Sequence, residues 1–160
     1  MVGASPAQAW AGTEMTTKMA KKEKYLHEEL TGKILQIAFD VANGLGCGFL
    51  EKVYENALAV GLRQAGLKVS QQIPVRVLYR GQTVGEYVAD MVVGGAVLVE
   101  VKATEQQHPI YIAQTLNYLK ATGLPVGLLL NFGRPKLAYK RLVSKKLLEG
   151  KEDNAQSDTA

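Results

Sequence analysis

The segment VLVEVKA, residues 97–103, constrains the fold most, because a carboxylate and an ammonium are set two positions apart into an otherwise apolar run. Its β-branched residues predict a strand. Side chains alternate along a strand, so Glu100 and Lys102 share one face while three valines line the other. Taken alone, this pattern favours an ordinary half-solvated strand that carries a charge pair on its outer side.

The period of the apolar residues predicts the elements around this strand, with helical spacing first and a period of two afterwards. In order, we expect a helix at 30–45, a helix from Leu50 to Gly66, strands at 69–79, 83–93 and 97–103, a helix at 109–122, and strands at 125–132 and 137–143. A two-residue turn at Gly94-Gly95 would make the first three strands an antiparallel meander. The strand at 125–132 is apolar enough to be buried on both faces, and the last strand is an edge strand. The order is ααβββαββ, an α/β fold.

The length of 160 residues predicts one domain. We place it at 25–148, between a disordered leader (1–24) and a disordered tail (149–160) that have too few apolar residues to pack. The chain has one cysteine, so it forms no internal disulfide, and it has neither a signal peptide nor an apolar run of roughly 20 residues. A cytoplasmic protein without membrane contact is therefore expected.

A net charge of +4 permits contact with a polyanion without requiring it. Two clusters of basic residues favour solvated surface over a binding patch. They consist of Lys18, Lys21, Lys22 and Lys24, and of Lys136, Lys140, Arg141, Lys145 and Lys146.

A second acid, Asp90, lies among apolar neighbours in the strand that the Gly94-Gly95 turn folds back against 97–103. A two-residue turn would place Asp90 slightly displaced from the position opposite Glu100, close enough for both acids to serve one site. Two neighbouring buried carboxylates repel each other, and a divalent cation such as Mg²⁺ relieves that cost.

Other motifs give weaker hypotheses. Three glycines at 44, 46 and 48 imitate part of a dinucleotide-binding loop, but they follow a helix instead of a strand. A hydrolase triad needs a histidine paired with a nucleophile, and the chain has only His27 and His108. Cys47, between two glycines, is expected to be a small packed side chain instead of a nucleophile.

The order of Asp90 followed by Glu100-Val101-Lys102 resembles the D…(D/E)-x-K signature of the PD-(D/E)XK nuclease superfamily. More narrowly, GFLEKVY at 48–54 is similar to the G-x-x-E-x-x-Y signature of the GxxExxY protein family. The resemblance spans residues 30–143, including GLLLNFG. It implies a restriction-endonuclease-like core, in which helices flank a mixed β-sheet.

The resemblance also implies roles at particular positions. Asp90 and Glu100 would be metal ligands, and Lys102 would orient the attacking water and offset charge in the transition state. Glu51 would hold a second ion or its water, although an acid in the first turn of a helix is also favourable through the helix dipole.

Three further residues are implied to bind the substrate. Gln114 and Tyr118 resemble the Q-x-x-x-Y motif of the nuclease branch related to RecB, and four residues apart on a helix they share one face. They would lean over the sheet toward Lys102 and the substrate phosphate; the alternative is a surface pair that makes one hydrogen bond. Tyr54 belongs to the G-x-x-E-x-x-Y signature, although its helical spacing alone is typical of a core residue.

These residues together predict a nuclease that depends on Mg²⁺ or Mn²⁺ and hydrolyses phosphodiester bonds, in DNA in preference to RNA. Endonuclease and exonuclease action both stay open, as does pairing into a homodimer that cuts both strands. The alternative is a catalytically weak or inactive module that binds nucleic acid or protein. It is favoured by Ala42 and Tyr111, which stand where similar proteins often carry histidine.

Overall fold

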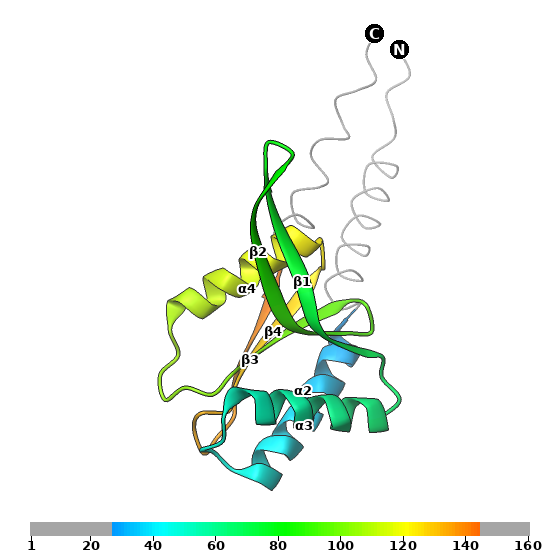
Figure 1. Cartoon of the computed structure of the whole chain (residues 1–160). Helices are drawn as coiled ribbons and strands as arrows, with labels where there is room; N and C mark the ends of the chain where they lie inside the picture. Colours follow the sequence, from blue (N-terminus) through cyan, green and yellow to red (C-terminus); the bar gives the residue numbers. More distant parts are fainter. Residues whose placement is uncertain (1–26, 145–160) are drawn as a thin grey trace, which may run out of the picture.

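The computed structural model describes residues 27–144. In order, these residues form α2 (Glu28–Leu45), α3 (Glu51–Gln64), β1 (Val69–Tyr79), β2 (Gln82–Val93), β3 (Val97–Lys102), α4 (Pro109–Thr122), β4 (Val126–Asn131) and β5 (Ala138–Val143) (Figure 1). The order ααβββαββ is confirmed. The predicted leader and tail lie outside the described residues, as do the first basic cluster and Lys145 and Lys146 of the second. Within the described part, no helix has the length and apolar character needed to cross a membrane.

The five strands form one mixed sheet in the order β1-β2-β3-β4-β5. The first three strands pair antiparallel, as the predicted meander requires, and β5 pairs antiparallel with β4 at the edge. β3 and β4 pair in parallel, because α4 carries the chain back to the starting end of the sheet between them. β4 is buried along its whole length, as predicted.

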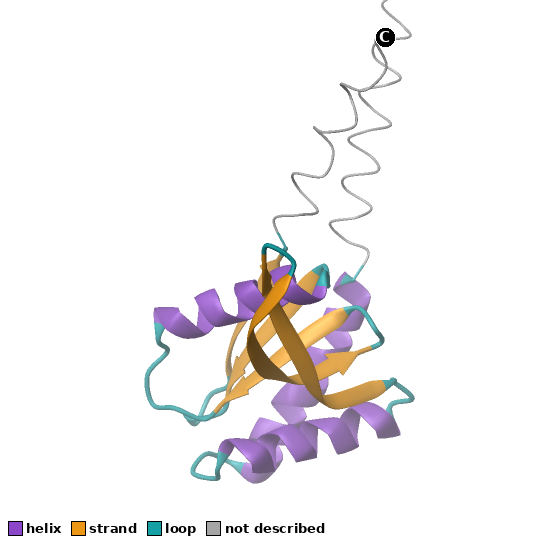
Figure 2. Ribbon diagram, turned by 45° about the horizontal axis from the view of Figure 1, so that its top comes forward, coloured by secondary structure: helices purple, strands orange, loops and turns teal. Residues whose placement is uncertain are grey.

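Helices cover both faces of the sheet. α2 and α3 lie on one face and α4 lies on the other, while the hairpin of β1 and β2 extends beyond the remaining strands (Figures 1 and 2). Two apolar cores result, one under α2 and α3 and one under α4. This double coverage explains why β3 is so apolar. The prediction that it is a half-solvated strand is wrong, because five of its six residues are buried.

The connection between α2 and α3 leads directly to one of the predicted site residues. α2 ends at Leu45, and Gly46 and Gly48 follow with φ values of 70° and 111°. Such values favour glycine because side chains with a Cβ clash there. Cys47 between them is exposed, so the expectation that it packs in the core is wrong. The loop returns the chain so that α3 begins at Glu51.

β1 has an irregularity opposite the other predicted site residues. Its register pairs Gln71 with Met91 and Ile73 with Ala89, so Gln72 lies across from Asp90. Gln72 has a φ of 55°, which is uncommon outside glycine. Consecutive strand residues normally face opposite ways, but Gln71 and Gln72 both reach the same side chain of α3.

Candidate active site

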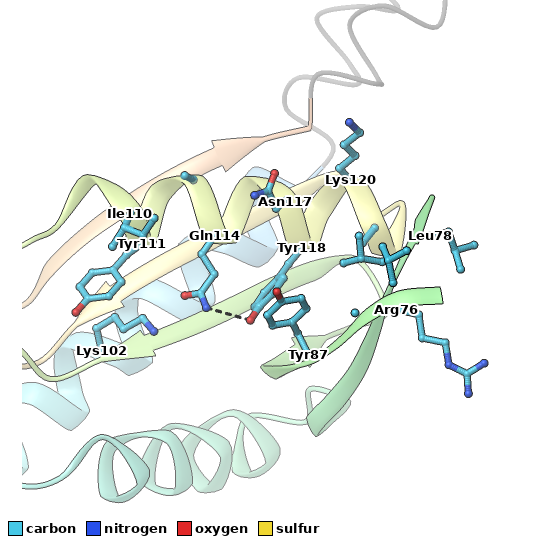
Figure 3. A pocket seen from close by; sticks show the side chains of 15 residues that line it. Arg76, Leu78, Tyr87, Lys102, Ile110, Tyr111, Gln114, Asn117, Tyr118 and Lys120 are labelled. Atoms are coloured by element: carbon cyan, nitrogen blue, oxygen red, sulfur yellow. Dashed lines mark hydrogen bonds between the residues drawn. The ribbon is translucent and has the colours of Figure 1, made fainter. Parts of the chain in front are cut away.

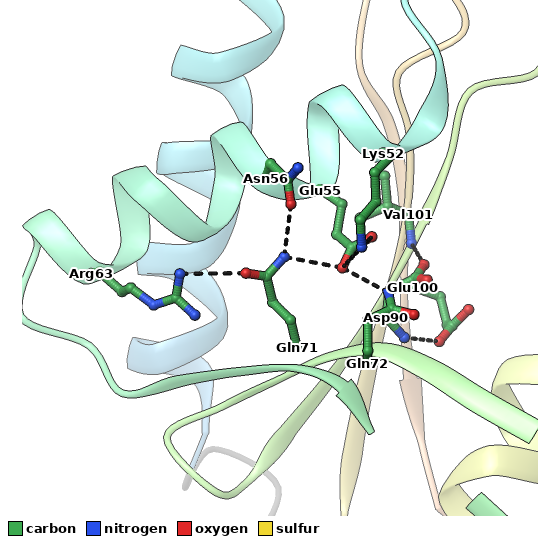
Figure 4. Close-up of polar contacts among 9 residues, drawn as sticks. All are labelled: Lys52, Glu55, Asn56, Arg63, Gln71, Gln72, Asp90, Glu100 and Val101. Carbon is green, nitrogen blue, oxygen red and sulfur yellow. Dashed lines mark hydrogen bonds and ion pairs between the residues drawn. The ribbon is translucent and has the colours of Figure 1, made fainter. Parts of the chain in front are cut away.

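Asp90 and Glu100 lie side by side where the ladder between β2 and β3 ends. The last backbone pairing joins Met91 and Val99. Beyond it, Glu100 Oε1 accepts the N–H of Asp90 at 3.0 Å, and Asp90 Oδ2 accepts the N–H of Val101 at 2.8 Å (Figure 4). Two side chains thus replace ladder hydrogen bonds, and each backbone N–H fixes one carboxylate.

The register places Asp90 level with Glu100, and the small displacement expected from a two-residue turn is absent. Val93 pairs with Val97, so the connection also includes Ala96 and is one residue longer than predicted. That extra residue moves the register by one position and brings the two acids directly opposite each other.

The two carboxylates are electrostatically strained. Burial raises the pKa of Glu100 to about 8, and the neighbouring Asp90 charge raises it as well. Burial also raises the pKa of Asp90, against the stabilising hydrogen bond from Val101. Glu100 is only 3% exposed. A cation near both groups would relieve this cost, because it stabilises the charged form of each.

Glu51 joins the same electrostatic cluster from the first turn of α3. Burial raises the pKa of its carboxyl, the ammonium of Lys102 lowers it, and the charge of Asp90 raises it. Glu51, Asp90 and Lys102 are therefore close enough to influence one another electrostatically. The helix N-terminus adds a favourable dipole for the anionic form of Glu51.

Tyr54 does not reach a surface that a substrate could contact, so its predicted direct role in substrate binding is wrong. Its side chain is fully buried and its ring stacks on Phe132 with centroids 4.8 Å apart. Its hydroxyl donates to the carbonyl of Gly46 at 2.6 Å and accepts the N–H of Phe49 at 3.2 Å. Tyr54 therefore anchors the loop that delivers Glu51, which accounts for a tyrosine three residues after that glutamate.

Gln114 and Tyr118 lie on the face of α4 that looks onto the sheet. Gln114 Nε2 donates to the Tyr118 hydroxyl at 3.1 Å (Figure 3). Burial raises the pKa of Tyr118, and the charge of Glu100 adds to that rise. Both residues line the same groove as Lys102. Their predicted role in contacting a substrate phosphate stays a prediction.

Lys102 and Tyr111 are in direct contact. The Lys102 Nζ lies 4.7 Å from the centroid of the Tyr111 ring, a cation–π geometry. Tyr111, one of the two positions where a histidine was expected, is therefore at the site, and the His108 ring lies 6.3 Å from it. The other such position, Ala42, is 8% exposed and packs in the core under α2 and α3.

A buried acid that the sequence analysis missed lies beside the cluster. Glu55 is 2% exposed and accepts hydrogen bonds from Lys52, Gln71 and Gln72 at 3.1, 3.1 and 2.9 Å (Figure 4). Its charge raises the pKa of both Asp90 and Glu51. The spacing of four residues from Glu51 was the available signal, because such residues share a helix face.

The end of β3 is held by residues that the sequence analysis also missed. Asn131 pairs with Lys102 across the parallel strands. Its Oδ1 accepts the N–H groups of Thr104 and Gly133 at 3.1 and 3.0 Å, and its Nδ2 donates to the Thr104 carbonyl at 3.0 Å. A Cβ on Gly133 would collide with the backbone of Thr104. These contacts fix the direction in which the chain leaves Lys102.

The donor set fits a hard divalent cation that retains several waters. Asp90 and Glu100 each commit one oxygen to a backbone N–H and keep the other for a ligand. Mg²⁺ typically takes one or two carboxylates and completes its shell with water and substrate phosphate. Across residues 27–144, three or more acids, histidines or cysteines are nowhere already gathered closely enough to enclose a metal.

A known protein family matches most of this chain. The model of the family described as "PD-(D/E)XK nuclease superfamily" matches residues 28–142. Among solved structures, the chain is similar to an alkaline exonuclease from Laribacter hongkongensis, at 15% identity and a TM-score of 0.45, over 64% of this chain and 60% of that chain. Curated protein sequences contain no match. The chain belongs to the PD-(D/E)XK nuclease superfamily.

Proposed function

We propose that this protein is a nuclease that requires Mg²⁺ or Mn²⁺ and hydrolyses phosphodiester bonds in DNA. The observation that carries the proposal is the pair of carboxylates of Asp90 and Glu100, which backbone N–H groups hold side by side, with Glu100 buried and Asp90 partly buried. Such a pair is costly without a cation and has the oxygen donors that Mg²⁺ prefers. Within the superfamily, the segment GFLEKVY supports placement in the GxxExxY family.

The residues around the pair have complementary roles. Asp90 and Glu100 would hold the metal ion through their free oxygens, and Glu51 would hold a second ion or its water. Bound metal supplies a nucleophilic water at neutral pH and relieves charge on the leaving oxygen. Lys102 orients that water and offsets charge on the phosphate, and its contact with the Tyr111 ring restricts its position.

The helix α4 supplies the contacts to the substrate phosphate. The hydrogen bond between Gln114 and Tyr118 uses one N–H of the amide and leaves the second N–H and the tyrosine O–H as donors. Both groups line the groove that contains Lys102. Donors at this place would hold a phosphodiester next to the carboxylate pair.

A second candidate function is a binding module without catalysis. It is favoured by Tyr111, which contacts Lys102 at a position where similar proteins often carry histidine. Calorimetric titration with Mg²⁺ separates the two functions. An active site binds the ion and loses that binding in Asp90→Asn, whereas a degenerate site takes up no ion in either protein.

The nuclease proposal is tested by incubation with single-stranded, duplex and branched DNA in Mg²⁺ or Mn²⁺. We expect metal-dependent cleavage that is lost in Lys102→Ala and retained in Lys33→Ala, which removes an exposed lysine of α2. RNA of the same sequence serves as the competing substrate. Absence of cleavage, or equal cleavage by the parent and Lys102→Ala, would overturn the proposal.

A further inference from the structure

A groove of about 870 Å³ connects the candidate active site with the β1–β2 hairpin along α4. Lys102 and Tyr111 lie at one end, Tyr118 and Tyr87 lie midway, and Leu78 of the hairpin lies at the other end (Figure 3). The rings of Tyr87 and Tyr118 are 6.0 Å apart and tilted by 47°. A molecule in this groove would therefore extend directly into the site that contains the catalytic lysine.

The walls of the groove expose large apolar side chains. Tyr87, Val84 and Leu78 from the hairpin are 51%, 62% and 63% exposed, and Ile110 from α4 is 62% exposed. Single exposed apolar residues are common, but several that line one concave surface mark a binding site. The hairpin extends beyond the rest of the sheet (Figure 1), and each of these four side chains is more than half exposed.

Charge is sparse in the groove and lies mostly at its margins. Besides Lys102, the lining cations are Arg76 and Lys120, whose side chains extend outward from the groove (Figure 3). Arg76 is also paired with Glu86 at 3.6 Å. Cations at the margins suit a phosphate backbone, whereas the apolar interior does not.

The combination points to a strand whose bases are exposed. A duplex hides its base faces and presents phosphates, so a duplex-binding surface needs many cations. Aromatic side chains between basic margins instead stack on unpaired bases. We infer that this groove binds single-stranded nucleic acid, with bases against Tyr87 and phosphates toward Arg76 and Lys120. The inference rests on the proposed nuclease function, because it names the substrate class of that same site.

The length of the groove sets the expected footprint. Its α4 lining runs from Ile110 to Ala121. At a rise of about 1.5 Å per residue, this stretch is roughly 16 Å long. Stacked nucleotides advance by about 3.4 Å each, so about four or five fit between the hairpin and Lys102. This footprint is at the short end of known sites for single strands.

Binding in EDTA tests the groove separately from cleavage. Fluorescence anisotropy would compare a labelled oligothymidine of about ten nucleotides with a mixed-sequence duplex of equal length. We expect tighter binding of the single strand, and a loss of roughly 5- to 150-fold in Tyr87→Ala, because one base loses its stacking partner. Tyr79→Ala is the matched control, since Tyr79 is 62% exposed on the same hairpin but does not line the groove.

A second variant guards against a folding defect in Tyr87→Ala. Ala113 is an exposed residue of α4 that lines the groove, so Ala113→Glu adds a carboxylate there without disturbing the core. We expect it to weaken binding of the single strand at low salt. Gln64→Glu adds the same charge at an exposed position of α3 and should leave binding unchanged. Melting temperatures of all four variants establish that each is folded.

Three results would overturn the inference. They are equal or tighter binding of the duplex, equal effects of each groove variant and its control, and a dimer in sedimentation that Tyr87→Ala dissociates, which would assign the groove to a second copy. Failure of the nuclease proposal has a different signature. Single-strand binding that depends on Tyr87, without any cleavage in Mg²⁺ or Mn²⁺, would support the groove as a binding site and overturn the nuclease proposal. Cleavage that is lost in Lys102→Ala, with the duplex bound as tightly as the single strand, would support the nuclease proposal and overturn the single-strand groove.

Discussion

The carboxylates of Asp90 and Glu100 meet where the ladder between β2 and β3 stops, and each accepts a backbone N–H from the opposite strand. A backbone N–H fixes a carboxylate but supplies only a dipole. The pKa of both groups therefore stays above its ordinary value, mainly because of burial. Removal of one negative charge, or addition of a cation, should stabilise the folded protein.

Substitution of Asp90→Asn tests this strain. Without metal, we expect the variant to melt at the same temperature as the parent or higher, because Asn removes a charge while its amide oxygen can still accept the N–H of Val101. Cleavage should be lost. Added Mg²⁺ should raise the melting temperature of the parent by mass action and leave that of the variant nearly unchanged.

Asp40→Asn is the control for this comparison, because it removes an exposed acid of α2. It should leave the melting temperature and the response to Mg²⁺ unchanged. If Asp90 instead belonged to a structural ion-pair network with Lys102, its loss would lower the melting temperature. A clear drop in the melting temperature of the metal-free Asp90→Asn protein, with no response of the parent to Mg²⁺, would contradict the predicted strain between the two carboxylates.

The pKa of Glu100, raised from 4.5 to about 8, predicts that the metal-free protein loses stability as pH rises. Between these values the folded chain holds a proton that the unfolded chain has released. The free energy of unfolding should therefore fall by up to about 1.4 kcal/mol per pH unit. The stabilisation that protonated Glu100 gives the folded protein is fully present below pH 4.5 and is lost above about pH 8.

Urea denaturation in EDTA from pH 5 to 8 measures this slope in the parent and in Glu100→Gln. The variant should show a shallower decline, because Gln does not titrate. Some slope should remain, since the pKa values of Asp90 and Glu51 are raised as well. Identical slopes in the two proteins would assign the pH dependence to other groups.

Apolar periodicity was sufficient to predict the order of the elements. It reports which side of each segment is buried, so the helices, the meander and the buried β4 could all be read from it. The charge pair within β3 was informative for the same reason, because Glu100 and Lys102 break an apolar pattern that the fold otherwise maintains.

Contacts between distant segments could not be read in this way. The level pairing of Asp90 with Glu100 depends on the turn including Ala96, a difference of one residue. The anchoring role of Tyr54 depends on a loop that folds back over its hydroxyl. Helical spacing pointed to core for Tyr54, and the family signature pointed to substrate; the hydrogen bonds reconcile both with a buried residue next to the site.

The anchoring role of Tyr54 predicts the effect of Tyr54→Phe. Phe keeps the stacking on Phe132 but leaves the carbonyl of Gly46 and the N–H of Phe49 without their partner. We expect a loss of about 1–3 kcal/mol in the free energy of unfolding. Cleavage should also fall, because the loop no longer holds Glu51 in place. Tyr139→Phe, at a residue that is 48% exposed, is the control and should change neither quantity.

Gly133→Ala tests whether the chain beyond Lys102 must follow its present path. The new Cβ would meet the backbone of Thr104, which cannot give way as a flexible side chain could. The loop must therefore shift and strain the hydrogen bonds to Asn131, at a cost of about 1–3 kcal/mol that urea denaturation can measure. Gly44→Ala is the matched control, because nothing lies within 4 Å of its Cβ and it is in α2, so it should be neutral or stabilising by up to about 1 kcal/mol. Equal stabilities of the two variants would show that Gly133 is not required by packing against Thr104.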